Sequence, residues 1–250
     1  MSIAEKFEKI TDAVYEKGKE KGKKDEHDKF WDIFQDYGNR RYYSNAFTSI
    51  TSTENFWNEE NFNPKHHIIL GESQNASDNM FLYTPIKDLE AILLRNGVEF
   101  DTSQTTRLNA CFDRSRVEKV PSLDASNCTT IIRVFYGANR LIKAGFLNIK
   151  EECTFNNVFV SCYDLKDLEI TGTIGQNGFN VKDCTKLSDA SLLSILIALS
   201  KDKSVASGKT VNFADNHLSV IEANEQCLAQ LSSASDAGWS IFFGTTKYEG

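Results

Sequence analysis

Apolar and small residues return at a spacing of 23 or 24 positions between Phe100 and Ile170. Two positions of this repeat carry large apolar side chains: Phe100, Leu123, Phe146 and Ile170 at one, and Phe112, Phe135 and Phe159 at the other. A period of about 20 to 29 residues is typical of stacked repeats, in which each unit needs a neighbour to cover its apolar face. The pattern therefore predicts a repeat domain, with these seven residues as its buried ladder.

Within each unit, the apolar spacing predicts a turn that leads into a short strand. Phe112, for example, is followed by Val117, Val120 and Leu123. Small residues stand three positions after the phenylalanines of the second set, namely Ser115, Ala138 and Cys162. We expect them where neighbouring units approach most closely, because a free Cys acts there as a small hydrophobe.

The N-terminal segment is predicted to be a helix from Ser2 to Lys24, since Ser2 and Glu5 form a capping-box pattern. Its apolar residues follow the spacing of a short coiled-coil seam: Ile3, Phe7, Ile10 and Val14. This seam favours a docking or oligomerisation helix. The alternatives are a helix packed on its own domain and a solvated leader.

The remaining chain divides into an aromatic segment and further elements around the repeats. A second helix is predicted over 28–37, ended by Gly38. Residues 39–79 lack periodicity and are rich in aromatic side chains, which favours an irregular cap over the first repeat; a carbohydrate-binding surface is the alternative. Further helices are expected at 88–96, 188–200 and 221–231, and strands at 210–213 and 239–243. The predicted domains are 1–38, 39–79 and 80–250.

Composition changes this picture by removing classes of function. The net charge of −7 argues against general nucleic-acid binding, which depends on Lys and Arg to neutralise phosphates. No apolar run approaches the length of about 18 residues needed to span a membrane. Met1 to Lys9 lacks the apolar centre of a secretory signal, so we expect that the protein leaves the cell only within an assembly or by lysis. The six cysteines show no metal-ligand spacing, which predicts reduced, mostly buried thiols.

No motif predicts a reaction, a metal site or a cofactor. Residues 207–210 end like a phosphate-binding loop, but the first glycine of that motif is replaced by Lys203 and the segment precedes a strand. His66, His67 and His217 are not accompanied by a matched set of ligands. We therefore predict no catalytic, metal-binding or cofactor-binding residue and no enzymatic activity. A hydrolase site assembled from distant residues is the alternative that the sequence leaves open.

One order of residues is seen from Phe112 to Ser126 and partly from Phe159 to Ile170: an aromatic residue, a small residue, Leu, Leu, then Asp and Ser or Thr. This order resembles the BspA-like leucine-rich repeats of bacterial surface antigens. The whole layout is similar to a group of these proteins encoded by phages and prophages of Gram-positive bacteria. Three segments carry that second resemblance: Tyr15–Gly18, Phe30–Asp32 and Asp36–Arg40. The chain departs from the repeat pattern where Phe146, Leu147 and Asn148 replace the usual Leu-Asp pair.

The resemblance implies an α/β fold: a leucine-rich-repeat-like solenoid with irregular short strands, an N-terminal helical extension and a helix-plus-strand C-terminal cap. It also implies a structural component of a phage particle, such as a tail or baseplate accessory, that is made in the bacterial cytoplasm. Expected partners are other virion or tail proteins, a host surface component, and further copies of the chain joined through the N-terminal helix. A free intracellular interaction protein, for instance a host-factor inhibitor, is the main alternative, and an envelope-acting hydrolase is the second.

Overall fold

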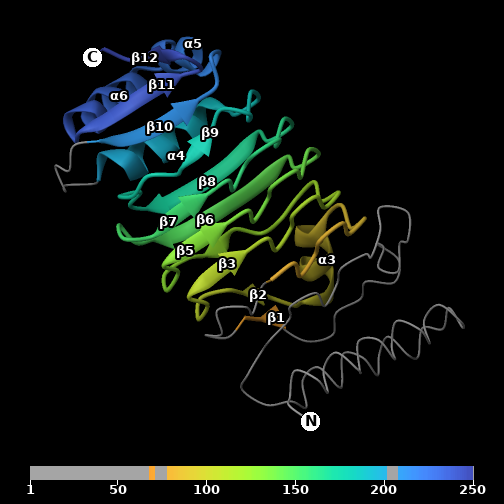
Figure 1. The fold of residues 1–250 in the computed structure, drawn as a ribbon. Coiled ribbons are helices and arrows are strands. Elements are labelled where there is room, and N and C mark those ends of the chain that lie inside the picture. The colour runs from red at the N-terminus through yellow and green to blue at the C-terminus, as the bar shows by residue number, and fades with distance from the viewer. Residues whose placement is uncertain (1–67, 71–77, 202–207, 250) are drawn as a thin grey trace, which may run out of the picture.

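The computed structural model describes residues 68–70, 78–201 and 208–249. These ranges form a mixed α/β structure with parallel sheets, in which every second strand from β3 to β8 is a neighbour in its sheet (Figure 1). The proposed docking residues Ile3, Phe7, Ile10 and Val14 lie outside the described residues, as do the predicted helix over 28–37 and most of the 39–79 segment.

The described elements follow one another in a regular order. They are β1 (Ile68–Ile69), α3 (Leu89–Asn96), β2 (Phe100–Asp101), β3 (Arg107–Asn109), β4 (Leu123–Asp124), β5 (Thr130–Ile132), β6 (Lys143–Ile149), β7 (Thr154–Asn156), β8 (Asp167–Gly172), β9 (Asn180–Val181), α4 (Asp189–Ser200), β10 (Lys209–Phe213), α5 (His217–Glu222), α6 (Glu225–Asp236), β11 (Trp239–Phe243) and β12 (Thr246–Lys247). Apart from β6 and β8, the strands before α4 have two or three residues, as expected of short strands that each belong to one turn of the chain.

In two parallel three-stranded sheets, paired residues are separated in the chain by the period of the sequence repeat. The first has the order β3-β5-β7 and the second β4-β6-β8. In the second sheet Leu123 pairs with Phe146, and Phe146 pairs with Ile170. Residues one sequence period apart are therefore neighbours across a strand pair, and their side chains point to the same face of the sheet.

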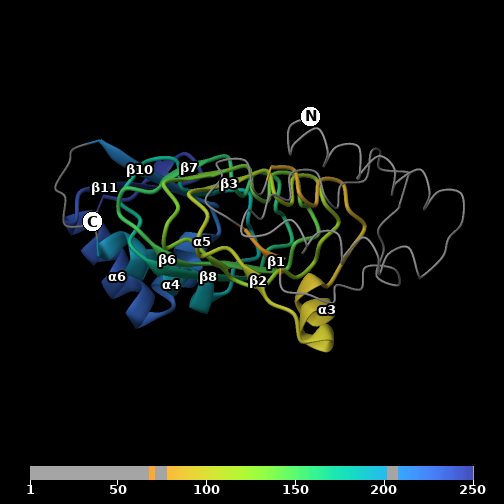
Figure 2. The ribbon, with the colours of Figure 1, turned by 90° about the horizontal axis from the view of Figure 1, so that it is seen from below.

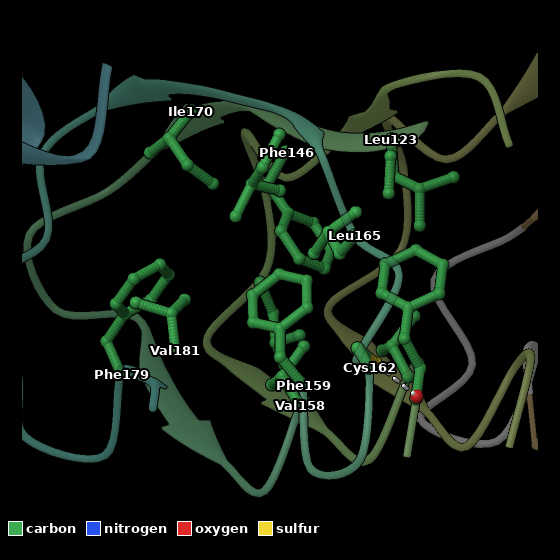
Figure 3. Close-up of a cluster of buried hydrophobic side chains, with 14 of the residues drawn as sticks. Leu123, Phe146, Val158, Phe159, Cys162, Leu165, Ile170, Phe179 and Val181 are labelled. Carbon is green, nitrogen blue, oxygen red and sulfur yellow. Dashed lines mark hydrogen bonds between the residues drawn. The ribbon is translucent and has the colours of Figure 1, made fainter. Parts of the chain in front are cut away.

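The core lies between these two sheets, which run along opposite sides of the molecule (Figure 2). Figure 3 shows Leu123, Phe146 and Ile170 pointing into this core from one side, and Phe159 and Phe179 meeting them from the other. The seven ladder residues are all buried. Four phenylalanines form a continuous stack along the core, with ring centroids 5.0 Å apart for Phe81 and Phe112, 5.5 Å for Phe112 and Phe135, and 5.9 Å for Phe135 and Phe159.

Each phenylalanine of this stack sits in a turn with two left-handed residues, one two positions before it and one two positions after. The pairs are Asn79 and Tyr83, Ala110 and Arg114, Arg133 and Gly137, and Asn157 and Ser161. The small residue three positions after the ring then closes the turn: the Ala138 N–H donates to the Phe135 carbonyl at 3.0 Å, and that of Cys162 to Phe159 at 3.3 Å. A bulky side chain there would meet the preceding unit, because Cys162 Sγ lies 3.0 Å from the carbonyl oxygen of Phe135.

The irregular stretch around Asn148 corresponds to a local shift in strand pairing. The Phe146–Ile170 and Ile149–Gly172 pairs leave one more residue in β6 than in β8. Asn148 adopts a left-handed conformation, and its N–H donates to Thr171 Oγ1 at 2.9 Å. An extra residue in one strand is a β-bulge, which explains why the sequence pattern changes at this unit.

After β8 the units become longer and contain helices. Helix α4 packs on β8 and α6, and its N-terminus is capped by Ser188 as the sequence predicted. The predicted helix over 88–96 and strands over 210–213 and 239–243 are also confirmed. The prediction of one helix over 221–231 is wrong: α5 ends at Glu222 and α6 begins at Glu225, because Asn224 Oδ1 accepts hydrogen bonds from the first N–H groups of α6.

All six cysteines are buried and free, which confirms the prediction of reduced, buried thiols. Burial raises the pKa of each thiol, for Cys153 to about 12, so the reactive thiolate form is disfavoured. Cys162 and Cys128 direct their sulfur atoms at backbone carbonyls of the preceding unit, Phe135 and Thr105. The cysteines therefore act as packing residues. None of the helices within the described ranges is long and apolar enough to cross a membrane.

Candidate interaction surface

The residues that the sequence raised as candidates for chemistry are separate and structural where they are described. No group of three or more metal-ligating side chains gathers within 68–70, 78–201 and 208–249. Lys209 opens strand β10 and is buried, with its Nζ 5.8 Å from the centre of the Trp239 ring. His66 and His67 lie outside the described residues. Lys209 thus belongs to the packing of the sheet and does not open a phosphate-binding helix.

His217 is fully buried and holds two parts of the C-terminal region together. Its Nδ1 accepts a hydrogen bond from the Ala214 N–H at 3.3 Å, which places the ring proton on Nε2, and Nε2 donates to the Cys184 carbonyl at 2.9 Å. Burial lowers the pKa of His217, and the bond to Cys184 opposes this only in part. The ring is therefore neutral at neutral pH in the folded protein and has a structural role.

This geometry predicts a loss of stability in mild acid. Because the folded state lowers the pKa of His217 below the value of about 6.5 expected in the unfolded chain, the unfolded state binds the proton more readily. The contribution of the neutral ring is complete above that value and falls as the pH drops through it. Between the unfolded-state and folded-state pKa values, the free energy of unfolding falls by at most about 1.4 kcal/mol for each pH unit. Urea unfolding of the wild type and His217→Gln at neutral and mildly acidic pH tests this: equal losses in both proteins would contradict it.

The ladder residues cannot form a binding surface, because their side chains face the interior. A different set of side chains gathers on the outside of the turns that hold Phe112 and Phe135. We call it the arginine–tyrosine cluster; it consists of Asp113, Arg114, Arg133 and Tyr136. The guanidinium carbon of Arg133 lies 4.2 Å from the centre of the Tyr136 ring, and that of Arg114 lies 5.5 Å from it. One aromatic ring thus orders two cations from neighbouring units.

The repeat geometry explains why these residues meet. Arg114 is the left-handed residue after Phe112, and Arg133 is the left-handed residue before Phe135. The Arg114 N–H donates to the Tyr136 carbonyl at 2.7 Å, which joins the two turns. Gly137 leaves room for the Arg114 side chain: a Cβ at this position would lie 3.0 Å from Arg114 Cγ. The arginine side chain therefore crosses the next unit and reaches Tyr136.

The buried carboxylate of Asp113 holds the guanidinium group of Arg133 in place. Arg133 Nη2 donates to Asp113 Oδ2 at 2.8 Å, and Arg114 Nη1 lies 3.9 Å from Asp113 Oδ1. The Asp113 side chain is only 5% exposed, whereas those of Arg133 and Arg114 are 39% and 48% exposed. Burial raises the pKa of Asp113, and the two arginines oppose that shift. A buried carboxylate therefore holds a guanidinium whose outer edge faces solvent.

Further cations lie along the same turns. Arg116 and Arg140 are exposed, and each directly precedes the buried residue that ends its turn, Val117 or Leu141. In the following unit Asp164 takes the position that Arg140 has here, and its carboxylate is already paired with Lys186. These two turns, residues 112–117 and 133–141, thus carry four arginines and a single carboxylate, Asp113, in a chain whose net charge is −7.

Sequence reasoning missed this cluster because it treated the units by their apolar positions alone. A signal was present: arginines stand at the polar positions two residues from Phe112 and Phe135, and a glycine occupies the position in the next unit that corresponds to Arg114. Only the register of neighbouring turns converts these separate positions into one surface.

No family model, no curated protein and no solved structure matches this chain. The function must therefore be inferred from the arrangement of its own residues.

Proposed function

We propose that this chain is a non-enzymatic binding protein whose described region is a leucine-rich-repeat-like solenoid. One observation carries the proposal: the sequence period and the strand register coincide, so that Leu123, Phe146 and Ile170 are paired neighbours inside one continuous core. Such stacking builds an extended surface from units that are rigid before any partner arrives. A preorganised surface loses little conformational entropy on binding, so modest contacts add up to useful affinity.

The setting we propose is a phage or prophage particle, in which the protein serves as a tail or baseplate accessory. The support is the resemblance of the whole layout to repeat proteins encoded by such elements. In this proposal the repeat surface contacts another protein or the host envelope, and the N-terminal seam docks the chain or joins copies of it. Several copies on one particle would raise the total affinity without any new contact.

The particle itself provides the direct test. An antibody against the purified protein is used on particles prepared from an induced culture of the bacterium that carries the gene, after density-gradient separation. We expect the protein to sediment with the particles at a constant ratio to the major tail protein. Recovery only in the soluble lysate would overturn the structural-component proposal and favour a free interaction protein.

The docking seam is tested by the mass of the full chain in solution. Light scattering of the wild type is compared with that of a double variant, Phe7→Glu with Ile10→Glu. We expect the wild type to be an oligomer and the variant a monomer. The cost of removing two carboxylates from water exceeds the free energy that a short apolar seam gains by burial. A wild type that is already monomeric would remove the oligomerisation proposal.

A further inference from the structure

We propose that the arginine–tyrosine cluster, together with Arg140, binds an acidic polypeptide segment of a partner protein through the carboxylates of its Asp and Glu side chains. This inference rests on the proposed function of the chain as a binding protein and names the partner chemistry of one of its surfaces.

The first argument is the availability of donors. The Arg114 and Arg140 guanidinium groups make no hydrogen bond to any residue that the structure describes; Arg114 has only its 3.9 Å ion pair and its contact with Tyr136. A guanidinium carries five N–H donors in a planar fork that matches the two oxygens of a carboxylate. Nearly half of the Arg114 side chain is exposed, so an incoming carboxylate reaches this fork without any rearrangement of the core.

The second argument is preorganisation. Arginine side chains normally lose much conformational freedom when they bind a ligand. Here Asp113 and the Tyr136 ring already hold Arg133, and Gly137 and Tyr136 guide Arg114. Both backbones are set in the left-handed conformation by the repeat itself. Binding therefore requires little additional ordering, which is the property that distinguishes a binding surface from a set of solvated charges.

The third argument concerns the class of ligand. Arginine and tyrosine are, with tryptophan, the residue types enriched where binding energy concentrates at protein interfaces. A long polyanion such as nucleic acid would be repelled by the rest of a chain with net charge −7. A short acidic segment needs only the local field of this edge, whose neighbouring acid Asp164 is neutralised by Lys186. The charge distribution thus favours a polypeptide over a nucleic acid.

The test uses the full chain and a fluorescein-labelled oligoglutamate peptide, with binding measured by fluorescence anisotropy at low and at physiological salt. The cluster variant is Arg114→Gln with Arg140→Gln. Its matched control is Lys150→Gln with Lys182→Gln, which removes the same charge from two exposed sites outside the cluster. We expect the cluster variant to lose affinity about tenfold or more, and the control to change about twofold or less, because only the first pair includes the guanidinium that the Tyr136 ring positions. Both variants alter exposed side chains, and equal melting temperatures verify that the fold is retained.

Three outcomes would overturn the proposal. Absence of peptide binding by the wild type would do so, and so would equal losses in the two double variants, which would indicate a response to total charge alone. Equal or tighter binding of a single-stranded oligonucleotide of the same charge would show that the surface binds polyanions in general and does not select a polypeptide. None of these results bears on whether the protein sediments with particles, so failure here is distinguishable from failure of the proposed function.

Discussion

Replacement of Phe135 by alanine is expected to lower the free energy of unfolding by about 3–5 kcal/mol. The ring is fully buried and lies at the centre of the stack, with Phe112 on one side at 5.5 Å and Phe159 on the other at 5.9 Å. Phe146 of the opposite sheet also contacts it, at 5.8 Å between ring centroids. Because all these neighbours are held by their own strands and turns, the cavity left by the ring cannot collapse fully, and the lost contacts are not recovered.

Urea unfolding followed by circular dichroism measures this loss. Leu94→Ala is the matched control, since Leu94 is a large apolar residue that is 82% exposed on helix α3. The control should change the free energy by about 0.5 kcal/mol or less. A Phe135→Ala protein with a midpoint close to that of the control would show that the phenylalanine stack does not hold the units together.

Gly172→Ala is the second change from which we expect a large effect. Gly172 ends strand β8 at the bulge opposite Ile149, with a φ of +98°. A Cβ there would lie 2.2 Å from the Ile149 carbonyl oxygen and 2.3 Å from its nitrogen. Both atoms are backbone, so the clash is relieved only by moving strand β6. We expect a loss of about 2–5 kcal/mol, from the unfavourable φ and the displacement of the strand together.

The chain offers a control with the same backbone angle. Gly208 has a φ of +97°, but no atom of the residues that the structure describes lies within 4 Å of the position that its Cβ would take. Gly208→Ala should therefore cost only the conformational part, about 1–2 kcal/mol. The free energy of unfolding of each variant is measured by calorimetry. The difference between the two losses gives the part that is due to the close approach of β8 to β6. Equal destabilisation by both changes would contradict the proposed role of the bulge.

The candidate surface was less predictable than the core. Its arginines were visible in the sequence, yet Arg114 and Arg133 are separated by a full turn of the chain, in which the periodic residues are the buried apolar ones. Polar positions on an outer edge are weakly constrained by packing, so they lack the period that marks a buried ladder. The Arg133–Asp113 bond and the shared Tyr136 ring depend on which turn lies against which, and that information is carried by strand register.

The amino-acid sequence by itself determined the period of the units, the buried positions within them and the helices with clear caps, α3 and α4. Burial of an apolar side chain and satisfaction of helix ends are local demands, and each leaves a local pattern. The tertiary structure alone decided three further features: the division of the ladder between one sheet and the turns that face it, the bulge at Asn148, and the basic edge around Tyr136. Each of these depends on contacts between units about 23 residues apart, whose side chains meet only after the units have stacked.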